Sequence, residues 1–205
     1  MDVSFDSAIA SFWKDVQSQY KDVIYNDPEL IGKSVYVFQT GYPSFRPELM
    51  VIGSNPGGGY AGEFSLTNGE MNRYLSDDLW FNRLRTVIPE HYLESCVGTN
   101  KYYVNTPQDK GIKNKKLKYL GTYFTRKLVD IIEPRHIICL HGDTFNTLVG
   151  NRNFIVPDSR INLKRGIYKN IPVCCIPNLS GKCQRFYKKD LLPIFNHAVY
   201  EFMNE

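Results

Sequence analysis

The 205-residue sequence lacks several features that would assign it to a common functional class. It has no apolar run of the ~18 to 20 residues that a membrane span requires, and its acidic, amphipathic N-terminus is unlike a signal peptide. Its five cysteines form no CxxC pair, and its four histidines form no HExxH or HxH arrangement. We therefore expect a soluble cytoplasmic protein with reduced thiols and no metal, associated with the nucleoid in a bacterium or nuclear in a eukaryote.

The hydrophobic pattern predicts a single α/β domain over residues 1–205. A content of 42% hydrophobic and 22% charged residues fits one folded core. Apolar runs that end in turn residues predict strands at 47–55, 101–107, 135–142 and 171–178. Helical spacing of apolar residues predicts helices at 4–23, 77–88, 115–132, 143–150 and 184–203. Alternating strands and helices favour a three-layer α/β/α sandwich around a mainly parallel four-stranded sheet, with ligands at the carboxyl ends of the strands.

Charge is distributed unevenly along the chain. Residues 1–99 contain seven basic and 13 acidic residues, whereas residues 100–205 contain 18 basic and eight acidic ones. The basic residues gather in 110–118 and in 160–189, and the second of these segments has no Asp or Glu. Such a half-molecule suits a polyanionic partner, and the alternative is an ordinary solvated basic face.

A glycine-rich loop follows the first predicted strand. Residues 51–65 read VIGSNPGGGYAGEFS, which lacks the GK[ST] ending of a phosphate loop and does not match GxGxxG in the register of a dinucleotide-binding helix. Pro56 stiffens the turn, so we expect Asn55 to have a fixed orientation in which its carboxamide positions a water or binds a ligand. The alternative is an Asn-Pro turn beside a close-packed helix.

This loop resembles the first motif, G-x-N-P-G, of the uracil-DNA glycosylase superfamily, and especially its mismatch-specific and single-strand-selective monofunctional branches. Gly53, Asn55, Pro56 and Gly57 match the motif. Phe64 is similar to the aromatic residue that stacks on the extruded base. Asn105 is similar to the strand-end asparagine that reads the pyrimidine edge. Residues 176–181 occupy the place of the second motif, so the resemblance spans about residues 48–190.

The resemblance implies a uracil-DNA glycosylase-like fold and a monomeric DNA-repair enzyme. Such an enzyme hydrolyses the N-glycosidic bond of uracil or a related damaged base in single- or double-stranded DNA, without a cofactor or metal. Asn55 would orient the attacking water, because a carboxamide is a poor general base. Extruding a base costs a few kcal/mol, roughly, which stacking and edge hydrogen bonds recover. The implied base-binding residues are Gly53, Pro56, Gly57, Tyr60, Phe64 and Asn105.

The second motif departs from the family pattern. Ile176 replaces its leading His or Asn, and Asn178 replaces its Ser. Asn178, Ser180 or His141 is the candidate to stabilise the departing base instead. The main alternative function is a catalytically impaired module of the same fold that binds nucleic acid or a base. A third possibility is a nucleotide or small-molecule hydrolase, which the lack of a lysine or an acidic metal cluster in 53–65 disfavours.

The segment after the second motif predicts contacts to DNA. Leu179 is the apolar candidate to wedge into a duplex, as the residues after this motif do in the family. Ser180, Lys182, Arg185 and Lys188 would contact the phosphate backbone, which gives affinity that is independent of sequence and weakens with salt.

Overall fold

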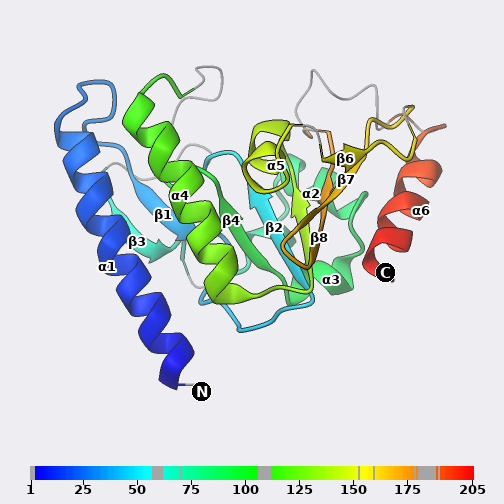
Figure 1. The fold of residues 1–205 in the computed structure, drawn as a ribbon, viewed down its shortest axis with the longest axis horizontal. Helices are drawn as coiled ribbons and strands as arrows, with labels where there is room; N and C mark the ends of the chain where they lie inside the picture. Colours follow the sequence, from blue (N-terminus) through cyan, green and yellow to red (C-terminus); the bar gives the residue numbers. More distant parts are fainter. Residues whose placement is uncertain are drawn as a thin grey trace.

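The computed structural model describes residues 3–56, 62–69, 71–105, 112–151, 153–158, 160–177, 179, 188 and 190–205. It is an α/β structure with one mixed, mostly parallel sheet and helices on both of its faces (Figure 1). The strands are β1 (Val35–Phe38), β2 (Leu49–Gly53), β3 (Phe64–Thr67), β4 (Val97–Asn100), β5 (His136–Cys139), β6 (Phe154–Ile155), β7 (Lys164–Tyr168) and β8 (Ile171–Cys175). The helices are α1 (Val3–Tyr25), α2 (Leu79–Arg85), α3 (Glu90–Glu94), α4 (Lys115–Ile132), α5 (Gly142–Leu148) and α6 (Leu192–Met203), with a 3-10 turn η1 (Arg73–Leu75).

The sheet is larger than the sequence pattern predicted. Within the described residues it has eight strands in the order β3-β1-β4-β2-β5-β8-β7-β6, so the expectation of four strands was wrong. The central four, β4-β2-β5-β8, are parallel to one another. The pair β1 and β3 extends one side, and the antiparallel pair β7 and β6 extends the other. Most of the additional strands were missed because they are short and only partly buried, which leaves no continuous apolar run.

One predicted strand was misplaced. In place of the strand expected at 101–107, the structure has β4 just before it, ending at Asn100. Within 101–107, Val104 forms an isolated bridge with Val35. After Asn100 the chain follows the loop beyond β2, because the backbone N–H groups of Lys101 and Tyr102 donate to the carbonyls of that loop. The tyrosine and valine content of 101–107 reflects burial of this segment rather than strand pairing.

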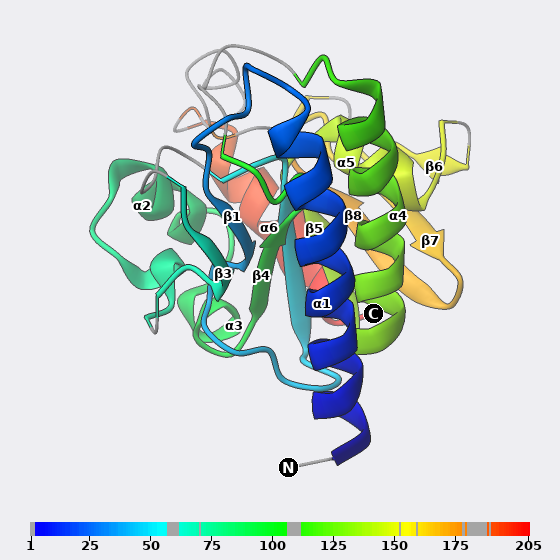
Figure 2. The same cartoon turned by 90° about the vertical axis from the view of Figure 1, so that its left-hand side faces the viewer.

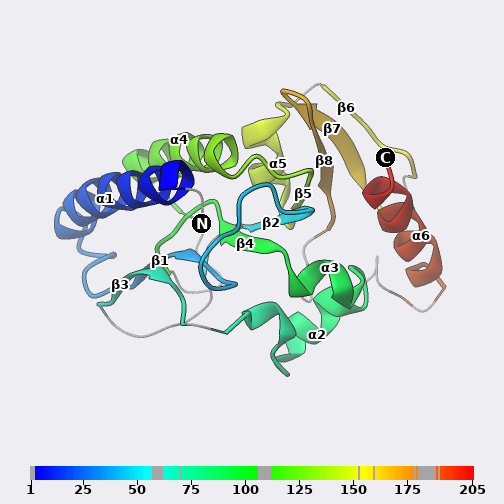
Figure 3. The same cartoon turned by 90° about the horizontal axis from the view of Figure 1, so that it is seen from below.

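Strict alternation along the strands divides the core into two halves, which makes the fold three-layered. In β2, Met50 and Ile52 pack in one apolar cluster with α1 and α4, whereas Leu49 and Val51 pack in a second cluster with α2, α3 and α6. Figures 2 and 3 show these two helical layers on opposite faces of the sheet. The period-2 direction of strand side chains requires this division once both faces are covered.

The predicted helices are largely confirmed. The expected helices 4–23 and 115–132 correspond to α1 and α4, and 77–88 contains α2. Two differences concern α5 and α6. His141 rather than Asp143 caps α5, and α6 begins at Leu192, so Pro193 lies in its first turn, where a missing N–H costs no helical hydrogen bond. Among the described helices, none combines the length and apolarity of a membrane span.

The topology gathers one set of chain ends at a single edge of the sheet. The parallel strands β2, β4, β5 and β8 all end there. Because β1 runs antiparallel to β4, with β3 parallel to β1, and β7 runs antiparallel to β8, the strands β1, β3 and β7 begin there. We call this the carboxyl edge, and it is where ligands bind in open α/β sheets.

Candidate functional site

The loop after β2 is fixed to its neighbours through its backbone. The carbonyl of Gly53 accepts from the Lys101 N–H at 3.0 Å and from the Thr144 hydroxyl at 3.1 Å, and the Ser54 carbonyl accepts from the Tyr102 N–H at 2.8 Å. A Cβ at Gly53 would lie 2.3 Å from Asn100 Oδ1, so any larger residue would force the buried Asn100 side chain to shift. These contacts hold the segment from both β4 and α5.

Asn55 lies at the end of this fixed segment. Its side chain is half-buried, and its Nδ2 donates to the carbonyl of the buried Pro56 at 3.3 Å. A carboxamide held in this way is positioned at the carboxyl edge, as the sequence predicted. Gly57 and Tyr60, the other loop residues expected to contact a base, lie outside the described residues.

His141 lies on the adjacent strand end and caps α5. Its Nδ1 accepts a hydrogen bond from the Asp143 N–H at 3.3 Å. A nitrogen that accepts carries no proton, so this hydrogen bond assigns the proton of the neutral imidazole to Nε2.

An ion pair with a buried lysine and a half-exposed aspartate supports the loops of Asn55 and His141. Lys101 Nζ lies 2.8 Å from Asp143 Oδ2, and the Tyr102 hydroxyl donates to the same oxygen at 3.0 Å. Burial opposes ionisation of Asp143, but hydrogen bonding and the charge of Lys101 lower the pKa of the carboxyl below its usual value. Burial and the neighbouring carboxylate raise the pKa of Tyr102, which therefore stays a neutral donor. Sequence reasoning missed this pair, because no local pattern links residues 42 positions apart.

A small cavity opens beside His141. It has a volume of about 190 Å³ and is lined by His141, Gly142, Asn162, Lys164, Cys175, Ile176 and Pro177. Lys164 begins β7 directly opposite Cys175, and its Nζ lies 4.9 Å from the centre of the Phe154 ring. The cavity therefore combines an imidazole with an ammonium group. Lys164 belongs to the basic segment 160–189, but only the antiparallel β7–β8 pairing brings it to the carboxyl edge.

The second-motif position holds core residues. The Ile176 side chain is 1% exposed and packs with Leu140 and Cys174 in the cluster below α6. Leu179 is also 1% exposed and packs in that cluster, while its carbonyl accepts from Arg83. The expectation that Leu179 is an exposed wedge was therefore wrong, since the side chain would have to leave the core to enter a duplex. Asn178, Ser180, Lys182 and Arg185 lie outside the described residues.

Phe64 and Asn105 lie on the other side of β2 at the same edge. The Ser34 N–H donates to Asn105 Oδ1 at 2.9 Å, and the Ser34 hydroxyl accepts from the Glu63 N–H at 3.3 Å, so Ser34 links the two segments. Asn105 is buried. The half-buried Phe64 ring packs on the core beside α1, with Lys21 Nζ 5.7 Å from its centre. Both residues thus have structural contacts in addition to their predicted roles.

Four predicted site residues, together with Lys164, which was not predicted, therefore lie along one edge. The β3–β1 side carries Phe64 and Asn105, the β5–β8–β7 side carries His141 and Lys164, and Asn55 lies between them on β2. Exposed lysines flank the edge at the start of α4 and before α6, namely Lys113, Lys115, Lys118 and Lys188. Only the sheet order shows this grouping, because the five residues are spread between positions 55 and 164 of the sequence.

No cluster of three or more potential metal ligands occurs within the part of the chain that the structure describes. The four described cysteines are buried and unpaired with one another, and burial raises the pKa of the Cys96 and Cys175 thiols to about 12. Comparison of the sequence with models of known protein families gives no match, and comparison with curated proteins gives none either.

Proposed function

We propose that the protein is a monofunctional DNA glycosylase that hydrolyses the N-glycosidic bond of uracil or a related damaged base. The observation that supports this proposal is that Asn55, His141 and Lys164 follow or begin strands at the same end of the sheet, and that His141 and Lys164 line one cavity there. A fixed carboxamide beside two hydrogen-bond donors suits a reaction in which a neutral water attacks and an anion departs. The G-x-N-P-G resemblance supports the same reaction from the sequence.

The departing base sets the main energetic requirement of this reaction. Cleavage of the glycosidic bond leaves negative charge on the base, and donors already aimed at that charge lower the barrier without reorganising. His141 meets this requirement, because its Nδ1 hydrogen bond leaves Nε2–H as the donor. Lys164 adds positive charge to the same cavity. His141 thereby takes the role that the buried Ile176 side chain leaves open.

Asn55 orients the attacking water in this mechanism. Its Nδ2 donates to the Pro56 carbonyl, which directs the carboxamide, and a carboxamide oxygen is an acceptor suited to a water O–H. Holding water near the anomeric carbon makes its attack effectively unimolecular, because the encounter with the water no longer has to occur by diffusion. A carboxamide does not deprotonate that water, so the glycosidic bond must be largely broken before the water adds to the anomeric carbon.

Base recognition is assigned to Phe64 and Asn105. The carbonyl of Asn105 already binds the Ser34 N–H, so the side chain is held rigidly and its NH₂ group is the part suited to a base carbonyl. Phe64 would stack on the extruded base after its ring shifts from the core surface that it covers beside α1. The exposed lysines of the carboxyl edge would neutralise phosphates and make binding depend on salt.

A second candidate function is a nucleic-acid-binding module without turnover. The burial of Ile176 favours it, because the second-motif position then contributes no polar side chain to the site. Turnover separates the two functions, whereas affinity does not.

A single-turnover cleavage assay tests the proposal. Labelled single- and double-stranded oligonucleotides that contain uracil are incubated with excess protein, and alkaline scission reveals abasic sites. We expect cleavage by the wild type, a loss of about 100-fold or more in Asn55→Ala, and a comparable loss in His141→Ala. Asn204→Ala is the matched control, because it removes an exposed amide at the C-cap of α6. This variant should cleave as the wild type does.

Binding is measured in the same samples. Binding without cleavage of uracil, hypoxanthine or xanthine substrates would establish the non-catalytic module instead. Equal cleavage by Asn55→Ala and the wild type would refute the role of Asn55. If the protein neither binds nor cleaves these substrates, a nucleic-acid function is refuted altogether.

A further inference from the structure

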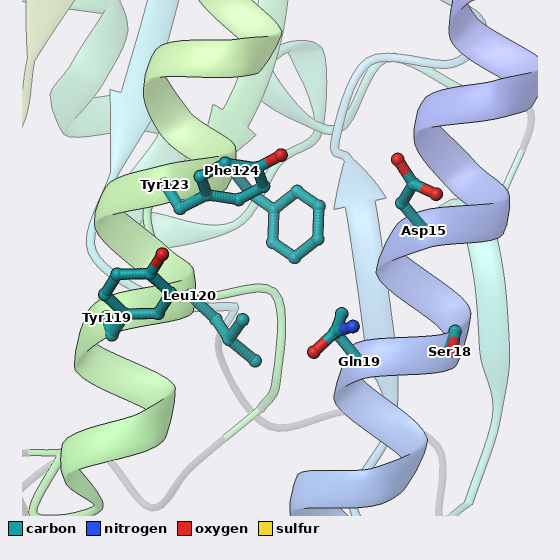
Figure 4. Close-up of a pocket in the computed structure, with 7 residues that line it drawn as sticks. All are labelled: Asp15, Ser18, Gln19, Tyr119, Leu120, Tyr123 and Phe124. Atoms are coloured by element: carbon teal, nitrogen blue, oxygen red, sulfur yellow. The ribbon is translucent and has the colours of Figure 1, made fainter.

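A second hollow lies away from the carboxyl edge, between α1 and α4. It has a volume of about 440 Å³, within the range of roughly 300 to 1,000 Å³ that is typical of ligand sites. It is lined by Asp15, Ser18 and Gln19 of α1 and by Tyr119, Leu120, Tyr123 and Phe124 of α4, and Figure 4 shows Asp15 and Gln19 on the side of α1 that faces α4. We call this hollow the tyrosine groove. Its floor is apolar, because Leu120 and Phe124 belong to the core.

Two exposed aromatic rings form one wall of the groove. Tyr119 is 66% exposed and Tyr123 is 45% exposed. They are four residues apart on α4, and their ring planes are within 12° of parallel, with centres 6.3 Å apart. Two flat, parallel, solvent-facing rings offer a platform on which planar groups stack in succession.

The charge around the groove identifies the class of partner. Helix α4 carries five basic residues and one acidic residue. The two aspartates of α1 nearest the groove are already neutralised, Asp15 by Lys127 at 2.6 Å and Asp22 by Lys116. This leaves Lys115 and Lys118, which precede Tyr119 on the same helix, as the charges that an incoming ligand meets. A polyanion is favoured over a basic peptide by this arrangement.

Helix α4 connects the groove to the carboxyl edge. Helix α4 descends from that edge toward the start of β5, so its first residues lie near the ends of the parallel strands (Figure 1). Tyr119 is four residues from Lys115, which corresponds to about 6 Å along the helix axis. A chain that leaves the edge past Lys115 therefore reaches Tyr119 next and Tyr123 after it.

We propose that the tyrosine groove binds a segment of single-stranded nucleic acid, with bases stacked on Tyr119 and Tyr123 and the backbone beside Lys115 and Lys118. A duplex hides the faces of its bases, so only an unpaired segment uses this platform. The choice of a nucleic acid rests on the proposed function, but the groove itself requires no cleavage. Gln19 and Ser18 on the opposite wall offer hydrogen bonds to sugar or base edges.

Fluorescence anisotropy with an undamaged, fluorescein-labelled oligothymidylate of roughly 12 nucleotides tests this inference, since sites of about 4 to 16 nucleotides are usual for single strands. We expect Tyr119→Ala/Tyr123→Ala to bind at least about fivefold more weakly than the wild type, the lower limit for one stacked base. Tyr119→Phe/Tyr123→Phe keeps the rings and should bind as the wild type does. Tyr200→Ala removes a comparably exposed tyrosine from α6 and serves as the matched control.

The outcomes separate this inference from the proposed function. If the double alanine variant binds the single-stranded oligonucleotide as tightly as the wild type does, the groove is not a nucleic-acid site, even if uracil is cleaved. Selective loss in that variant supports the groove, even if no base is ever released. Equal loss for a duplex and a single strand would overturn the stacking assignment. Melting temperatures are recorded for every variant, because Tyr123 also packs edge-on against Phe124. An affinity loss that is seen only at temperatures where the alanine variant begins to unfold would overturn the reading of these rings as a ligand platform.

Discussion

The ion pair between Lys101 and Asp143 is buried at one end only, and this asymmetry predicts unequal effects of removing its two partners. The Lys101 side chain is 5% exposed, whereas that of Asp143 is 54% exposed. Removing one partner of a fully buried pair costs about 3 to 5 kcal/mol, and exposed pairs contribute about 0 to 1 kcal/mol. Asp143→Ala leaves an ammonium group buried without its counter-charge, so we expect it to lower the free energy of unfolding by about 2 to 3 kcal/mol.

Lys101→Met should cost less. The carboxylate that remains is half exposed, water replaces the lost hydrogen bond, and methionine fills most of the space, so a loss of about 1 kcal/mol is expected. The double variant should be more stable than Asp143→Ala alone, because it removes the buried charge that this variant strands. Asp130→Ala, which breaks the exposed pair with Lys169, is the control and should cost at most about 1 kcal/mol.

Urea denaturation at several pH values measures these differences. The folded-state pKa of Asp143 is lowered, so the stability that its charge contributes is fully present above its unfolded value of about 3.9 and is lost as pH falls through the folded pKa. The gap between the wild type and Asp143→Ala should therefore narrow in acid. If Lys101→Met costs as much as Asp143→Ala, or the double variant is no more stable than Asp143→Ala, the asymmetry of burial does not govern this pair.

Three further predictions concern packing and reactivity. Gly53→Ala should lower the free energy of unfolding by about 1 to 3 kcal/mol, because its Cβ would meet Asn100. Gly142→Ala has open space around its Cβ and should raise the free energy of unfolding by about 0.4 to 1 kcal/mol. Denaturant titration of both variants checks this, and equal effects would contradict it. Leu179→Ala should cost about 2 to 5 kcal/mol in the same assay, and a neutral result would restore Leu179 as an exposed wedge. Burial raises the pKa values of four thiols, those of Cys96, Cys139, Cys174 and Cys175, so they should resist a thiol reagent at about pH 8 in the native protein and react after unfolding. Mass spectrometry of the labelled peptides measures this, and labelling of any of the four in the native protein would contradict their burial.

The sequence by itself predicted the elements whose signal is local. The stripe of Phe5, Ile9, Phe12 and Val16 predicted α1, and the pattern of 115–132 predicted α4 with its bounds. Both signals repeat over several turns, so they exceed the noise of single positions. The apolar runs before Gly53 and Leu140 predicted β2 and β5, because fully buried parallel strands are apolar on both faces.

The tertiary structure decided the size of the sheet and the composition of the site. Strand β3 forms through pairing with β1, and the short, partly buried β6 and β7 form through antiparallel pairing within the β6–β7–β8 segment. Strand β4 lies where β2 pairs with it rather than where tyrosine and valine are richest. The sequence named Asn55, Phe64 and Asn105, but not the Lys101–Asp143 pair or the approach of Lys164 to His141. These contacts join segments from different strands, and their energies depend on which strands are neighbours. Local pattern carries the periodicity of one element, whereas register and sheet order arise only when all the elements are packed together.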